Sequence, residues 1–334
     1  MASAGERAYV FAKACGIVSK SWIGRRAATL RGISRLAELD RLVFSTGARE
    51  LPEKELLGDL EARLLTRSVN AALSLLGSYA RPPEILIRLV KVYEYAELKS
   101  LVALKRRGFP SAPPSHADIG AFGAIRYQAW PDLAGMLAGT EYAFIIDRRG
   151  AFISDEGVSV ETALDNDYYA KLWKSLVRLR KRDRAASEKI LREEISLRNC
   201  VWALRLRTYY EMPPDTVKRH LVAVEGENFS ADAEAALELP LDNREAWLRW
   251  KRLAFLNDDS AAWKADPRYF QNSASLYLYR LALRGMRLHA LSIDAAFCFI
   301  KLKQFEEDLL TSYAEGLSLG MSGDDVARML EAGA

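Results

Sequence analysis

The sequence predicts an all-α protein made of three similar helical units. Apolar residues recur every three or four positions along most of the chain, which is the period of an amphipathic helix. Only residues 142–146 could be argued as a strand, and they continue a helical run with no second strand to pair with. A similar helix end occurs three times, at intervals too long for a solenoid repeat of roughly 20 to 50 residues. The intervals match the size of a small domain instead.

The repeated helix end has an acidic or amide residue followed by Leu or Cys and then by apolar and basic positions. Its copies span residues 94–108, 196–208 and 305–316. We take Glu97, Asn199 and Asp308 as equivalent, which places the copies 102 and 109 residues apart. This interval predicts helical units at residues 1–110, 116–222 and 230–334.

In the first unit, apolar residues at threes and fours predict an amphipathic helix over residues 30–43. Pro52 suits the first turn of the next helix, and the acidic residues after it suit that positive helix end. The pair Pro82 and Pro83 interrupts this pattern. A further helix is expected from Glu84 to about Arg107.

Turn-rich residues 108–115 separate the first unit from the second. There, Asp118 is a candidate N-cap, and helices are expected over residues 131–146, 162–182 and 186–210. Residues 225–230 form the next linker. The third unit should hold helices near residues 231–239, 243–256, 270–284, 292–316 and 322–332, with Asp294 and Ser322 as N-caps.

Composition narrows the class of protein. The 334 residues are 50% apolar and 28% charged, which is ordinary globular composition. A net charge of only +4 argues against a dedicated nucleic-acid binder, which carries a concentrated basic face. The charge is uneven: residues 1–49 hold nine Lys or Arg against three acids, and residues 305–331 hold seven acids against one Arg. If the two ends of the chain lie close together, they should attract.

Cysteine usage and hydropathy indicate a protein of a reducing compartment. The three cysteines are odd in number and far apart, so they are expected as free, buried, small apolar residues. No signal-peptide pattern opens the sequence. The longest uncharged run, residues 68–80, is 13 residues long, whereas a membrane span needs about 20. We expect a soluble protein that reaches a membrane only through a partner.

Sequence signatures of catalysis, cofactors and metals are absent. There is no Gly-x4-Gly-Lys-Ser/Thr or Gly-x-Gly-x-x-Gly phosphate loop, no Cys-x-x-Cys, no His-Glu-x-x-His and no Gly-x-Ser-x-Gly. None of the three histidines has a second one at metal-ligand spacing. We therefore predict no catalytic residue, no cofactor and no metal.

One basic stretch, residues 171–189, could bind a partner. On a continuous helix, Lys174, Arg178 and Arg182 share one face, with leucines on the other. Such a face is either solvated or a docking surface for an acidic protein or for phosphates. The further candidates that could extend it are Arg205, Arg207, Lys105 and Arg106.

Four segments carry a resemblance to a known family. Residues 7–13 resemble a Tyr-x-Tyr-Val-x-Ala-Arg opening, residues 137–143 a Leu-x-Gly-Thr-x-Tyr-Ala segment, and residues 160–169 a Leu-Asp-x-x-Tyr-Tyr stretch. Residues 195–207 resemble an Ile-Asp-Leu-x-Asn-Leu helix, the most specific of the four. Together they resemble the C-type subunit of the archaeal and bacterial V-type ATPase/ATP synthase, the equivalent of the d-type subunit of the eukaryotic vacuolar enzyme. Ser196 replaces the usual Asp, and Glu97 and Asp308 replace the usual Asn, so the resemblance is to a divergent member.

The resemblance implies a non-catalytic funnel of three helical units with pseudo-threefold symmetry. Such a protein sits on the cytoplasmic face of the membrane rotor ring, and the central shaft subunits (D and F type) plug into its mouth. It would couple ATP-driven rotation to proton or sodium transport. The implied location is cytoplasmic, peripheral to the membrane through the complex, with no direct membrane insertion and no nucleic acid as partner.

Two other functions stay open from the residues alone. The first is an all-helical adaptor that docks an acidic protein through residues 171–189. The second is an all-α enzyme whose site is assembled from residues distant in sequence, which would require a deep pocket with convergent polar groups.

Overall fold

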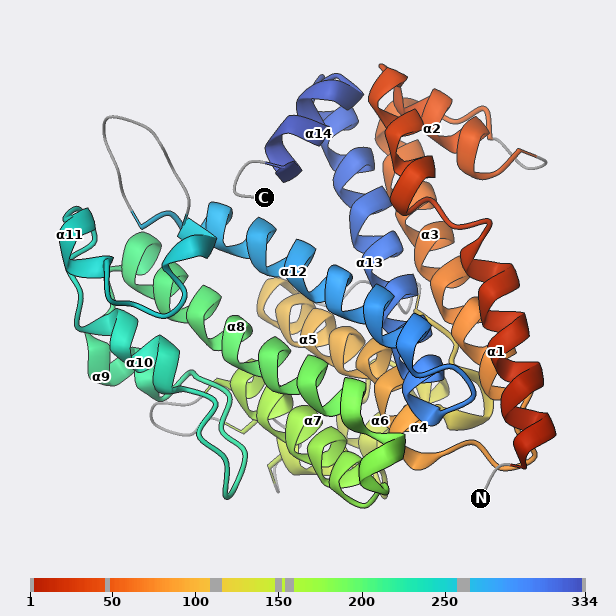
Figure 1. Cartoon of the computed structure of the whole chain (residues 1–334), viewed down its shortest axis with the longest axis horizontal. Helices are drawn as coiled ribbons and strands as arrows, with labels where there is room; N and C mark the ends of the chain where they lie inside the picture. Colours follow the sequence, from red (N-terminus) through yellow and green to blue (C-terminus); the bar gives the residue numbers. More distant parts are fainter. Residues whose placement is uncertain are drawn as a thin grey trace. The chain divides into compact units, whose positions relative to one another are not determined.

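The computed structural model describes residues 3–45, 49–108, 116–147, 152–153, 159–256 and 265–331, except the side chains of residues 105–107. Within these ranges the protein is all-α (Figure 1), as the hydrophobic period predicts. The only β-type pairing in the described part is an isolated bridge between Ile146 and Phe152. Residues 142–146 therefore belong to no strand.

The α-helices differ widely in length. In chain order they are α1 Ala4–Val18, α2 Leu36–Val43, α3 Glu53–Leu76, α4 Glu84–Val90, α5 Val92–Arg107, α6 Leu133–Leu137, α7 Val160–Val177, α8 Ala185–Tyr210, α9 Pro214–Lys218, α10 Ala231–Leu237, α11 Arg244–Trp247, α12 Pro267–Leu288, α13 Ile293–Ser318 and α14 Gly323–Glu331. The described 3-10 helices are η1 Gly24–Gly32, η2 Gly120–Phe122, η3 Tyr127–Ala129, η4 Ala143–Ile145, η5 Lys181–Asp183 and η6 Leu253–Leu256.

The chain groups into two compact units. Unit 1 joins residues Met1–Pro82 to Arg268–Ala334, and unit 2 is the continuous segment Pro83–Pro267. The division between Pro82 and Pro83 falls at the proline pair that interrupts the helical pattern of the sequence. The predicted division into helical units 1–110, 116–222 and 230–334 follows different boundaries and stays a prediction.

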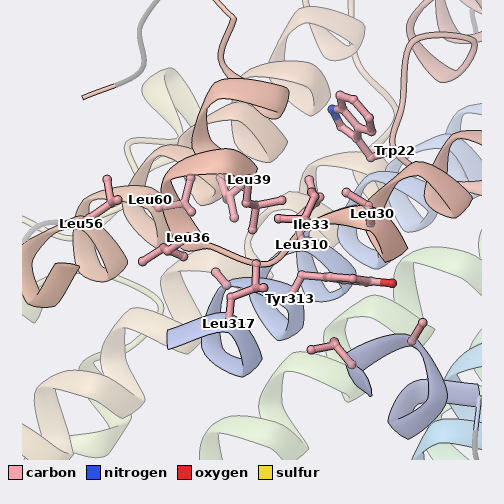
Figure 2. Close-up of a cluster of buried hydrophobic side chains, with 14 residues drawn as sticks. Trp22, Leu30, Ile33, Leu36, Leu39, Leu56, Leu60, Leu310, Tyr313 and Leu317 are labelled. Carbon is pink, nitrogen blue, oxygen red and sulfur yellow. The ribbon is translucent and has the colours of Figure 1, made fainter. Parts of the chain in front are cut away.

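In unit 1, the two ends of the chain build one core. Helix α13 packs along α3 and also contacts α1 and α2. Figure 2 shows Leu310 and Leu317 of α13 in one cluster with the leucines of α2 and α3, and the Tyr313 ring on the side of Leu30. The basic start and the acidic end meet as well, because Arg31 pairs with Asp324 at 2.8 Å and with Glu331 at 2.5 Å.

In unit 2, α7 and α8 form the centre. Helix α7 packs against α4 and α5, and α8 carries α9 and α10. Leu164 and Leu172 of α7 and Leu191 and Ile195 of α8 are fully buried. These positions follow the helical period, so the amphipathic pattern of the sequence does locate the core of this unit.

Several predicted helices are shorter than the sequence suggested. The predicted helix 30–43 is wrong, because Ser34 interrupts it and its backbone N–H donates to the Glu38 carboxylate at 2.9 Å. The predicted helix 131–146 is also wrong. Gly139 has a φ of 69°, a left-handed conformation that ends a helix, and only α6 and η4 form there.

The basic helix 162–182 and the helix 243–256 also end early. Helix α7 stops at Val177, whose carbonyl accepts a hydrogen bond from Arg184 Nη1 at 2.5 Å. The predicted helix 243–256 reduces to the short α11 and η6. The helix expected from Glu84 to Arg107 divides into α4 and α5 at Lys91.

The predicted caps have mixed outcomes. Ser322 is confirmed: its Oγ accepts from the Asp325 N–H at 3.2 Å, and the Asp325 carboxylate accepts from the Ser322 N–H at 3.1 Å. The prediction for Asp118 is wrong, because Ile119 is the N-cap of the short η2, although the Asp118 carboxylate accepts from the Gly120 N–H at 2.7 Å. The prediction for Asp294 is wrong, because this residue is fully buried within the first turn of α13 and Ser292 occupies the cap position.

Candidate partner-binding residues and buried helix anchors

The candidate cations of the basic stretch do not share one helix face. Lys174 lies in the last turn of α7, Arg178 is the C-cap of that helix, and Arg182 belongs to η5. The interpretation of this stretch as one amphipathic helix is therefore wrong. Instead, the structure brings the three residues together around the turn that joins α7 to α8.

These three side chains face solvent. Lys174 and Arg178 are exposed and form no ion pair with any described residue. The Arg182 side chain is 71% exposed, and its nearest carboxylate, that of Asp183, lies 3.9 Å away. All three cations are thus available to a partner.

The candidate cations on α8, Arg205 and Arg207, are less exposed than those of the turn. Arg207 Nη1 donates to the carbonyl of Ala236 at 2.9 Å and to that of Leu239 at 2.5 Å, which holds the end of α10 against α8. Burial lowers the pKa of Arg207. Arg205 is half-buried on the same helix. The side chains of the remaining candidates, Lys105 and Arg106, lie outside the described part of the chain.

A buried asparagine anchors a returning segment to α8. Asn199 Nδ2 donates to the carbonyls of Val222 at 2.9 Å and Phe229 at 3.3 Å. Its Oδ1 accepts from the Val222 N–H at 2.7 Å. One fully buried side chain therefore satisfies three backbone groups, as buried polar groups require.

A buried glutamate has the same function on α5. Glu94 accepts from the backbone N–H groups of Ala124 and of Ile125, the latter at 3.1 Å. Its other oxygen accepts from Tyr142 Oη at 2.6 Å and pairs with Lys91 at 3.2 Å. The segment after α5 is thus tied to the helix by one carboxylate.

The third anchor is Glu306 on α13. Its Oε1 accepts from the Trp22 N–H at 2.7 Å and pairs with Arg67 at 3.1 Å. Its other oxygen contacts Lys303. Here the anchored segment comes from the first part of the sequence, at Trp22.

These anchors give a different register for the predicted repeat. The buried residues Glu94, Asn199 and Glu306 recur at intervals of 105 and 107 residues, which are more even than the predicted pair. Two of the three positions taken from the sequence do not fit, since Asp308 is exposed and Glu97 is half-buried.

The residues three positions before the three anchors form a second set with the same spacing. They are Lys91, Ser196 and Lys303, and both lysines pair with their anchor glutamate. Ser196 lacks a charge, but the buried Arg252 donates to its Oγ at 3.4 Å. The sequence did contain this signal: an aliphatic residue precedes Lys or Ser, and Glu or Asn follows three residues later.

Burial and ion pairing shift the pKa values of several described residues. Burial alone would raise the pKa of Glu141, but Lys91 and Lys171 beside it hold that pKa at about 2. Burial raises the pKa of the Cys200 and Cys298 thiols. These two cysteines are free and buried, as predicted, whereas Cys15 is exposed.

No cluster of metal-ligating side chains occurs among the described residues. A hollow lined by Arg67, Lys303 and Glu306 has an empty volume of about 180 Å³ including open solvent, below the roughly 300–1,000 Å³ of ligand pockets. Over the same described ranges, no helix is long and apolar enough to cross a membrane.

Comparison with known proteins identifies the family. The family model described as ATP synthase (C/AC39) subunit matches residues 46–329, most of the chain. An uncharacterized protein of Treponema pallidum (strain Nichols) is 29% identical over 326 residues, covering 93% of this chain and 92% of that protein. The chain therefore belongs to the ATP synthase (C/AC39) subunit family of the V-type ATPase complex, a family of non-catalytic subunits, and is not an enzyme in itself.

Proposed function

We propose that this protein is the central-stalk socket of a V-type rotary ATPase or ATP synthase. In this function it couples the shaft subunits of the D and F type to the membrane rotor ring during proton or sodium transport. The match to the C/AC39 family over residues 46–329 is the observation that carries the proposal.

The mechanical properties of the fold support a coupling function. A torque-transmitting protein must be stiff, and close-packed helical cores have low compressibility. Helices α8 and α13 each have 26 residues, so each is about 39 Å long at 1.5 Å per residue. Their buried anchors, Asn199 and Glu306, tie other segments to them by hydrogen bonds. Loads along these helices would thus pass into the rest of each unit.

Affinity purification from the source cells tests the proposal. A tagged chain, extracted with membranes in mild detergent, should co-purify with nucleotide-binding ATPase subunits, shaft subunits and ring subunits. Recovery of none of them, with a different stoichiometric partner instead, would contradict the proposal.

A pair of charge variants tests the candidate residues within the same complex. The double variant Lys174→Glu/Arg178→Glu should reduce recovery of a direct partner if the α7–α8 turn contacts it. The control Arg244→Glu/Arg249→Glu makes the same charge change at exposed positions elsewhere in unit 2. Equal recovery with both variants would remove these two residues from the interface.

A second candidate function, an adaptor for an acidic protein, is favoured by one observation: the exposed cations of the α7–α8 turn lack ion pairs with described residues. Capture of an acidic partner in the absence of all ATPase subunits would favour this alternative.

A further inference from the structure

The turn between α7 and α8 carries a dense set of exposed cations. We call residues 174–189 the α7–α8 tip. Figure 1 shows the two helices side by side in unit 2, and their packing places the ends that the turn joins next to each other. The exposed basic residues of the tip are Lys174, Arg178, Arg180, Lys181, Arg182 and Lys189.

The fold of the tip depends on other residues. Arg184 is the basic residue that turns inward: it donates to the Val177 carbonyl at 2.5 Å and pairs with Glu188 at 3.0 Å. Asp183 is buried. The six exposed cations are therefore not needed to close the turn.

These six cations have few acidic neighbours in the structure. Among the described residues, the closest ion-pair contact of any of them is that of Arg182 with Asp183, at 3.9 Å. Lys174, Arg178, Arg180 and Lys181 have no ion pair with a described residue. Like charges held this close repel one another, so an external anion that neutralises them is favoured.

The distribution of the charge indicates the kind of anion. The cations come from the end of α7, the turn and the start of α8, so positive charge is spread over the tip rather than directed at one point. The exposed large apolar residue among them is Val177, at 43%, and the tip contains none of the exposed aromatic anchors that dominate protein interfaces. A flat surface with many mobile negative charges fits this distribution better than one acidic side-chain cluster.

We propose that the α7–α8 tip binds the anionic headgroups of a phospholipid bilayer. Polybasic segments bind such surfaces electrostatically. Their affinity rises by about fivefold for each Lys or Arg residue near the membrane. The contact is electrostatic and involves no insertion of a helix. It goes beyond the proposed coupling function, because it is a direct contact of this chain with lipid that needs no other protein.

Vesicle sedimentation with the purified full chain tests the contact. The probes are vesicles of phosphatidylcholine alone and vesicles with about 30% phosphatidylglycerol. The tip variant Lys174→Gln/Arg178→Gln/Arg180→Gln/Lys181→Gln lowers the net charge from +4 to 0. The control variant Arg41→Gln/Lys54→Gln/Arg81→Gln/Arg244→Gln makes the same change at dispersed exposed positions.

The proposal predicts binding of the unmodified chain to the anionic vesicles only, weakening as salt rises from roughly 50 to 300 mM. The tip variant should bind at least about a hundredfold more weakly, and the control within about threefold of the unmodified chain. Equal losses in both variants would show a net-charge effect and overturn the proposal. Absence of vesicle binding would also overturn the proposal. Tighter tip-dependent binding to a poly-glutamate peptide would overturn it as well, and would identify an acidic protein as the partner of the tip. None of these results bears on co-purification with ATPase subunits, so the coupling function is tested separately.

Discussion

At the scale of single residues, the buried Asn199 has a large expected effect on stability. Replacing it by Leu keeps a similar volume but leaves the Val222 N–H and the carbonyls of Val222 and Phe229 without a partner in a buried site. Each unsatisfied buried group costs about 1–3 kcal/mol, so Asn199→Leu should lower the free energy of unfolding by about 3–5 kcal/mol. Urea unfolding followed by circular dichroism measures this.

The neighbouring Asn166 supplies the control. Its Oδ1 accepts from the Ala223 N–H at 2.9 Å in an exposed site. Because water can replace this partner, Asn166→Ala should cost less than about 1 kcal/mol. If both variants lost the same stability, the anchor function of Asn199 would be wrong.

A second residue-scale prediction concerns pH. Burial raises the pKa of Glu97 from 4.5 to about 7. Above pH 7 the folded state must hold the half-buried carboxylate in its charged form, which lowers the free energy of unfolding. As the pH falls from 7 to 4.5, protonation progressively removes this loss of stability, and below pH 4.5 the loss is absent. The substitution Glu97→Gln should therefore stabilise the protein by about 1–3 kcal/mol at pH 8 and have little effect near pH 4.5.

Denaturant unfolding of Glu97→Gln and of the unmodified chain at both pH values measures this difference. Comparing the two proteins at each pH cancels the titration of other carboxylates. Glu50→Gln makes the same substitution at an exposed position and serves as the control. A stabilisation by Glu97→Gln that is equal at both pH values would contradict burial as the cause.

At the scale of elements, α14 packs against η1 at a position that only glycine fits. A Cβ on Gly323 would lie 2.2 Å from the Leu30 carbonyl oxygen and 2.8 Å from that of Ile33, both backbone atoms. The Gly323 N–H also donates to Ile33 at 2.7 Å. Gly323→Ala should separate the two elements and cost about 2–4 kcal/mol of unfolding free energy.

The matched control is a glycine with free space. A Cβ on Gly58, within α3, meets no atom within 4 Å. Alanine is a better helix former there, so Gly58→Ala should raise the free energy of unfolding by about 0.5–1 kcal/mol. Thermal unfolding of both variants should thus shift in opposite directions, and a shared direction would refute the steric argument.

The same elements show what the sequence can and cannot predict. The period of apolar residues located the long helices α8 and α13 to within a few residues, because burial of one face is a local pattern. It could not find the end of α7, which depends on Arg184 from the following turn. It also could not rank Glu94 above Glu97 as an anchor, since only the segments packed on α5 decide which carboxylate is buried.

At the scale of the whole molecule, sequence segments spread along the chain indicate the family. The grouping of the chain into two compact units depends instead on packing between the two ends of the chain. The core of unit 1 combines Trp22, Leu36 and Leu60 with Leu310 and Tyr313. A division that assigns residues 1–110 to one unit and 230–334 to another would cut through this core. Fragments can distinguish the two groupings.

Residues 83–267 should fold as an isolated fragment, because unit 2 is continuous in sequence. Residues 1–110 should not, because without α13 the apolar face of α3 is exposed and the Trp22 N–H loses its acceptor on Glu306. Co-expression of residues 1–82 with residues 268–334 should restore the core. Cooperative thermal unfolding and dispersed amide NMR signals are the readouts for each sample. The opposite result would be cooperative unfolding of fragment 1–110 alone, with no association of fragments 1–82 and 268–334. Three separately folding units would then describe the molecule better than two, because the contacts between its ends would contribute little to either core.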